Sequence, residues 1–186
     1  MFMRADPTLA QLGGSYAPSL PRGFVFAGVL FVQAAAANPA FNGRWKLDAE
    51  QSTSLDPWST LEMEIDLTDD AISIIRHYAA GTRVADETVK LRNEPVVQTI
   101  TVEGWWDNRH IDAWLGNNDQ IEVTPRWREG GRTLVLHIRM VLETQQGDRA
   151  VGVTRTLTLG EDGQTLREVQ KRESRKRPVV HVYQKL

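Results

Sequence analysis

The sequence predicts an all-β protein whose strands form an antiparallel up-and-down β-barrel of roughly eight to ten strands. Apolar and polar side chains alternate with a period of two along most of the chain, as in strands with one buried and one exposed face. Turn residues interrupt this alternation at intervals of about 10 to 15 residues. No helical periodicity follows Asn38, so helices are not expected in the folded domain.

The first half of the alternating region contains the clearest strand. Apolar residues alternate with acidic ones from Leu61 to Leu67, which gives this strand one apolar and one charged face. Turn residues such as Asp69-Asp70 and Gly81 separate it from the strands that follow. Besides the strand that carries Trp45, the expected strands of this half lie at 61–67, 71–79, 83–91, 96–103 and 109–115.

The second half carries the strongest hairpin signals. Gly130-Gly131 and Asp162-Gly163 are dipeptides that favour tight hairpin turns. Because the connections are short, consecutive strands are expected to pair antiparallel, and such a long meander has to close or split to remove its edges. The expected strands of this half lie at 120–128, 132–144, 150–159, 165–173 and 179–184.

Residues 1–37 are predicted to be a secretory signal peptide, which leaves 38–186 as a single barrel domain. Arg22 precedes a short apolar run at 23–32, and Ala34–Ala37 supply an Ala-x-Ala cleavage site. A membrane-spanning helix needs roughly 20 apolar residues, which this run lacks. We therefore expect a periplasmic or secreted protein, with an uncleaved N-terminal anchor as the alternative.

Composition excludes several functional classes. The chain has no cysteine, which rules out disulfides, thiol nucleophiles and a lipoprotein anchor. A net charge of −2 argues against binding nucleic acid by bulk charge, and charged residues on nearly every strand argue against a lipid-facing band. No Gly-x-Ser-x-Gly turn and no metal-ligand spacing of histidines is present. No catalytic residue, metal or cofactor is therefore expected.

Gly43 and Trp45 open the first strand as a Gly-x-Trp unit, in which glycine permits a tight bend and the indole plugs the barrel end. With the strand count and the export signal, this unit resembles the first motif of the lipocalin and calycin superfamily. The chain looks most similar to the small secreted lipocalin-like proteins of bacteria. The resemblance implies a late basic residue across the Trp45 ring, and Arg172 is the expected one, with Lys171 and Arg175 as alternatives. A tryptophan in the core of another β-sandwich is the competing interpretation.

Arg76 and Arg155 are the best candidates for ligand contacts, because each shares a strand face with aliphatic residues. A buried cation needs an anion, which is either a carboxylate-bearing ligand or an internal carboxylate. The internal candidates are Asp112, Glu122 and Glu168. Tyr78 lies on the same face as Arg76 and joins the expected ligand-binding set.

His181 and Tyr183, two residues apart in the last strand, resemble the Arg-x-Tyr pair with which fatty-acid-binding barrels hold a carboxylate. They complete the polar part of the expected site, with simple packing as the alternative. Trp105, Trp106 and Trp114 lie in or near a turn, where tryptophans line a ligand entrance, contact a partner or stabilise a hairpin. Of these, Trp105 and Trp114 are the expected ligand contacts.

The expected function is that of an exported, lipocalin-like carrier that binds a small hydrophobic or amphipathic molecule in its lumen, without covalent chemistry. Two alternatives stay open. In the first alternative, the barrel is filled by its own side chains and serves as a structural or interaction module that contacts a partner through its Trp-rich loop. In the second, the barrel is an enzyme that acts on a lipophilic substrate. The size of the lumen separates these possibilities.

Overall fold

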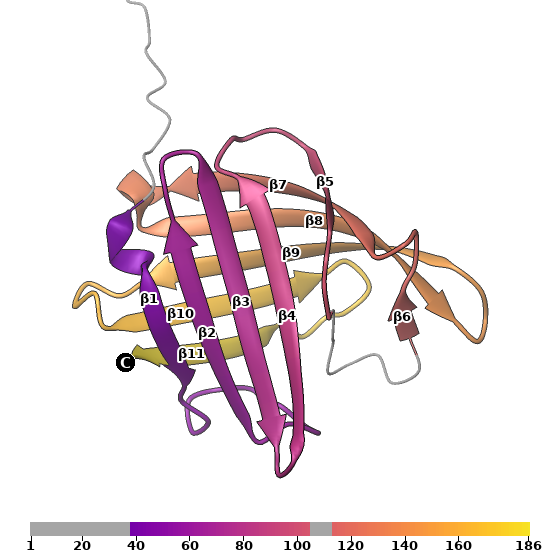
Figure 1. The fold of residues 1–186 in the computed structure, drawn as a ribbon, viewed down its shortest axis with the longest axis horizontal. Coiled ribbons are helices and arrows are strands. Elements are labelled where there is room, and N and C mark those ends of the chain that lie inside the picture. The colour runs from indigo at the N-terminus through magenta and orange to yellow at the C-terminus, as the bar shows by residue number, and fades with distance from the viewer. Residues whose placement is uncertain (1–37, 105–112) are drawn as a thin grey trace, which may run out of the picture. The chain divides into compact units, whose positions relative to one another are not determined.

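The computed structural model describes residues 38–104 and 113–186, so the predicted signal peptide and the Trp105-Trp106 turn lie outside the described residues. The described residues are nearly all antiparallel β-structure, as the alternation predicts (Figure 1). Within these two ranges, two 3-10 helices, η1 (Pro39–Phe41) and η2 (Glu129–Gly131), accompany the strands. The described residues form eleven strands: β1 (Gly43–Leu47), β2 (Thr60–Leu67), β3 (Ala71–Ala80), β4 (Arg83–Arg92), β5 (Gln98–Thr101), β6 (Ala113–Leu115), β7 (Gln120–Arg128), β8 (Thr133–Thr144), β9 (Arg149–Leu159), β10 (Thr165–Arg172) and β11 (Val179–Lys185).

Sequence neighbours pair along most of the sheet, in the order β4-β3-β2-β1-β11-β10-β9-β8-β7-β5. The first strand therefore pairs with the last inside the sheet, and the sheet curls into a nearly closed up-and-down barrel whose edge strands are β4 and β5. In Figure 1, β1–β4 run across the direction of β7–β11. Among the described residues, no helix has the length and apolar content needed to span a membrane.

A narrow seam nearly closes the barrel between its edge strands β4 and β5. The amide of Thr88 in β4 donates to the carbonyl of Glu103, which follows β5, over 2.9 Å. Gly104 comes next, with φ of +68°, and a β-carbon there would overlap the backbone carbonyl of Asp86. Glycine at this position is therefore what lets the two edges approach.

Two of the predicted strands differ from those observed. The segment expected at 96–103 is a strand only over β5, and the described part of the segment expected at 109–115 is the short strand β6. β6 does not lie between β5 and β7 but pairs with the end of β8, where Leu115 is opposite Leu142. β6 can pair there because β8 is longer than its pairing with β7 requires. β8 continues past Arg139, the last of its residues that pairs with β7, to Thr144.

The Gly-x-Trp unit closes one end of the barrel. Trp45 is fully buried and its Nε1 donates to the carbonyl of Phe41 over 2.9 Å. Phe41 in turn packs against Trp127 in a T-shaped arrangement, with 5.3 Å between the ring centroids. Lys185 lies over the Trp45 ring, with its Nζ 5.1 Å from the centroid, and donates to the carbonyl of Ala40.

The cation over Trp45 is thus Lys185, and the expectation for Arg172 is corrected. Strand register gives the reason, because Trp45 in β1 lies directly opposite Lys185 in β11. Thr165 begins β10 and lies opposite Gln184, the residue before Lys185. Arg172 is the last residue of β10 and lies opposite Val153 of β9. Arg172 is therefore at the far end of its strand from the Trp45 plug.

Candidate functional site

A network of charged and phenolic side chains lies inside the barrel, where the alternation of five strands directs it. Its members are all buried or nearly so and come from β3, β4, β9, β10 and β11. Strand register places Arg76 of β3 opposite Glu87 of β4, and Glu168 of β10 opposite His181 of β11. The network consists of Arg76, Tyr78, Glu87, Arg155, Glu168, His181 and Tyr183.

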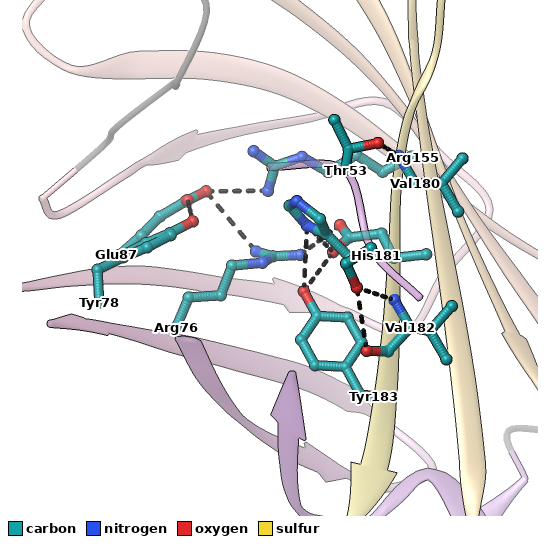
Figure 2. A network of polar contacts seen from close by, with 11 residues as sticks. Thr53, Arg76, Tyr78, Glu87, Arg155, Val180, His181, Val182 and Tyr183 are labelled. Carbon is teal, nitrogen blue, oxygen red and sulfur yellow. Dashed lines mark hydrogen bonds and ion pairs between the residues drawn. The ribbon is translucent and has the colours of Figure 1, made fainter. Parts of the chain in front are cut away.

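Ion pairs between distant strands join the two sides of this network. Arg76 Nη2 donates to Glu168 Oε1 over 2.8 Å, and Arg155 Nη1 donates to Glu87 Oε1 over 2.9 Å. A third, longer pair connects Arg76 Nη1 with Glu87 Oε1 at 3.7 Å. Figure 2 shows Arg76 lying between Glu87 on one side and Tyr183 and His181 on the other. The four charged groups thus form one continuous chain across the lumen.

The phenols complete the hydrogen bonding of the two carboxylates. Tyr183 donates to Glu168 Oε2 over 3.0 Å, and Tyr78 donates to Glu87 Oε2 over 3.3 Å. The Nδ1 atom of His181 lies 3.5 Å from the Tyr183 hydroxyl and 4.0 Å from Glu168 Oε2. Each carboxylate therefore meets an arginine with one oxygen and a tyrosine with the other (Figure 2).

The ionisation of the network follows from these contacts. Burial alone would raise the pKa of Glu168, but Arg76 and Arg155 outweigh it and lower that pKa to about 2. For Arg76 burial lowers the pKa, and the carboxylates of Glu168 and Glu87 raise it above its ordinary value. Burial and the neighbouring carboxylates raise the pKa of Tyr78 and Tyr183. Both phenols accordingly stay protonated and act as donors.

The arginines and glutamates of the network balance one another's charge without any ligand. Two arginines face two carboxylates, and the side chains of Arg76 and Glu168 are only 3% and 5% exposed. Glu168, with its lowered pKa, is a weak base, and phenols with raised pKa values are weak acids. For Glu168, Tyr78 and Tyr183 this arrangement favours neutralising buried charge over transferring protons near neutral pH.

A small cavity lies beside the network, between β3, β4, β7, β8 and β9. Arg76, Glu87 and Arg155 line its polar side, and aliphatic residues such as Leu136 and Met140 line the rest. Its volume is about 10 Å³, which is close to the space that one water molecule needs. Arg76 Nη1 and Arg155 Nε have no hydrogen-bond partner among the described residues. The cavity thus combines very little space with buried donors.

The structure brings five of the predicted ligand-binding residues together and separates the others. The five in the network are Arg76, Tyr78, Arg155, His181 and Tyr183. Trp114 lies apart from them, since it is 60% exposed on β6 while its neighbour Leu115 points inward. Trp105 lies outside the described residues.

The carboxylate partners were predicted only in part. Glu168 is an internal partner as expected, whereas Glu122 is exposed on the outer face of β7 and Asp112 lies outside the described residues. Glu87, the partner of Arg155, was missed. The signal was present in the sequence, because Glu87 shares a strand face with the apolar Val89 and Leu91.

Metal-ligating residues do not gather in the part of the chain that the structure describes, where no group of three or more histidine and acidic side chains has suitable geometry. No protein-family model matches the chain. A search of curated proteins also finds no match.

Proposed function

We propose that this protein is an exported binding module that engages its partner with its outer surface, while its own side chains fill the barrel. The observation that carries the proposal is the mutual pairing of Arg76 and Arg155 with Glu87 and Glu168. In a carrier of carboxylate ligands, the interior arginines would be available to the ligand. Here a ligand carboxylate would have to displace an internal one that is already hydrogen-bonded.

The size of the interior supports the same proposal. Ligand pockets for small molecules measure about 300–1,000 Å³, whereas the cavity beside the network measures about 10 Å³. Large side chains such as Leu136 and Leu157 are fully buried, as expected of a barrel that is filled by its own side chains. At the end of the barrel near Tyr78, the Trp58 ring lies 5.8 Å from the tyrosine ring.

Native mass spectrometry of the full chain tests the proposal. The protein is incubated with a mixture of fatty acids and neutral lipophiles, and its mass is compared before and after denaturation. We expect the bare mass in both states, since the cavity of about 10 Å³ beside the network is far too small for these molecules. A saturable one-to-one adduct that is lost on denaturation would contradict the proposal.

The lumenal carrier is the second candidate, and one observation favours it. Arg76 and Arg155 present buried donor atoms to the cavity, as an anion-binding barrel would. The variant Glu87→Gln separates the two candidates, because it leaves Arg155 without its partner. A carboxylate carrier should gain affinity for fatty acids in this variant. A filled barrel should lose stability and still bind none.

A further inference from the structure

A concave groove lies on the outer face of β7, β8 and β9, on the side of the sheet away from the buried network. It measures about 640 Å³, which is within the range of small-molecule sites. Its walls are mostly polar and include the exposed side chains Arg126, Arg128, His137 and Arg139. This groove is more than fifty times larger than the cavity of about 10 Å³ inside the barrel.

The arginines of the groove form no close ion pair with the described residues, although Glu122 lies opposite Arg139 in the strand register. Arg126, Arg128 and Arg139 make no ion pair or side-chain hydrogen bond with the described residues. Elsewhere on the surface Arg44 pairs with two glutamates, at 2.7 Å and 3.1 Å. The glutamates of the groove, Glu122 and Glu173, are likewise unpaired within the described part of the chain. Three arginines therefore face the groove against two carboxylates.

Strand register arranges the groove in rows. Thr124, His137 and Thr154 lie side by side on β7, β8 and β9 and form a row of hydroxyl and imidazole groups. Arg126 lies beyond one side of this row, opposite Val135, and Arg139 lies beyond the other side, opposite Glu122. Val135, opposite Arg126, lies four residue steps from Arg139, which places the two arginines roughly 13 Å apart along the strands. A ligand lying on the row would thus have a guanidinium within reach on either side of it.

From this arrangement we propose that the groove binds a small anionic sugar, carrying a phosphate or a carboxylate. Guanidinium groups match phosphate and carboxylate oxygens with paired hydrogen bonds. The threonines and His137 can exchange hydrogen bonds with sugar hydroxyls, and the exposed Val97 at the rim offers an apolar contact. The inference rests on the proposed function, because it gives the outer surface its ligand.

Isothermal titration calorimetry with the full chain tests this site. The probes are a hexose monophosphate, glucuronate and galacturonate, with glucose and inorganic phosphate as controls. We expect saturable binding of at least one anionic sugar, and much weaker binding of glucose and of inorganic phosphate. Each of Arg126→Gln and Arg139→Gln should weaken binding about tenfold, since each removes a charge-assisted contact. The matched control Arg167→Gln alters an exposed arginine outside the groove and should leave the affinity unchanged.

Three results would overturn the inference: no binding of any anionic sugar, equal binding of inorganic phosphate, or full affinity in the Arg126→Gln/Arg139→Gln double variant. Because all three substituted arginines are exposed, circular dichroism should show an unchanged fold for each variant. If native mass spectrometry detected a lipophile bound inside the barrel, the proposed function would be refuted, but the binding of sugars in the groove would not. If native mass spectrometry showed the bare mass and calorimetry showed no sugar binding, only the inference about the groove would be refuted.

Discussion

Replacing Glu168 by glutamine would remove one of the two carboxylates that neutralise the interior arginines. Arg76 would lose its partner at 2.8 Å while its side chain remains 3% exposed. Removing one partner of a buried ion pair costs about 3–5 kcal/mol, because the remaining charge is left without compensation. We expect a loss of this size in the free energy of unfolding, measured by urea denaturation.

Glu62→Gln is the matched control for this variant. Glu62 accepts from Arg44 at 2.7 Å, nearly the same distance, but these side chains are 33% and 58% exposed. An exposed pair contributes at most about 1 kcal/mol, so the control should cost far less. The comparison isolates burial, since the chemistry of the two substitutions is the same.

A double variant tests whether the cost comes from charge imbalance. Arg76→Met combined with Glu168→Gln leaves Arg155 and Glu87 paired at 2.9 Å, so the interior charges balance again. The double variant should therefore be less destabilised than the sum of its single variants, by about 2 kcal/mol. The reasoning would be refuted if Glu168→Gln cost no more than Glu62→Gln, or if the two single effects simply added.

Three further predictions concern pH and the closure of the barrel. Because the pKa of Glu168 falls from 4.5 to about 2 on folding, it contributes about 3 kcal/mol above pH 4.5. This stability should disappear between about pH 4.5 and 2 in urea titrations of the native protein and be absent from Glu168→Gln. Gly104→Ala should cost about 2 kcal/mol more than Gly81→Ala and speed hydrogen exchange at the Thr88 amide, since a β-carbon would meet backbone atoms at Gly104 and open space at Gly81. Equal costs for the two variants would contradict the close approach of β4 and the segment after β5. Lys185→Met should lower the unfolding free energy by about 1–2 kcal/mol, and the exposed Lys46→Met should leave it nearly unchanged, because only Lys185 lies over Trp45.

The alternation of side chains was sufficient to predict the barrel and the inward direction of its arginines. Strand β7 has the predicted bounds, and the predicted strands over β8–β11 differ from the observed ones by a residue at some ends. This success has a physical reason, because a period of two is imposed locally by the pleat of each strand. Arg76 and Arg155 are buried for the same reason, as their strand faces are otherwise mainly aliphatic.

Partners across the lumen could not be predicted in the same way. Arg155 meets Glu87 across 68 residues of sequence, and Arg76 meets Glu168 across 92. Such contacts depend on the register of every intervening strand and on where the barrel closes, which no local pattern determines. The same limit explains Lys185, whose position over Trp45 follows from the pairing of the first strand with the last.

The charge balance inside the barrel is the central claim, and carbon-13 NMR of the glutamate side-chain carboxyls during a pH titration tests it most directly. If Arg76 and Arg155 neutralise Glu168, its carboxyl resonance should stay in the ionised position down to about pH 3 and titrate near pH 2. A Glu168 resonance that titrates at pH 4.5 or above would show that the arginines do not hold this carboxylate. The interior arginines would then be available to a ligand.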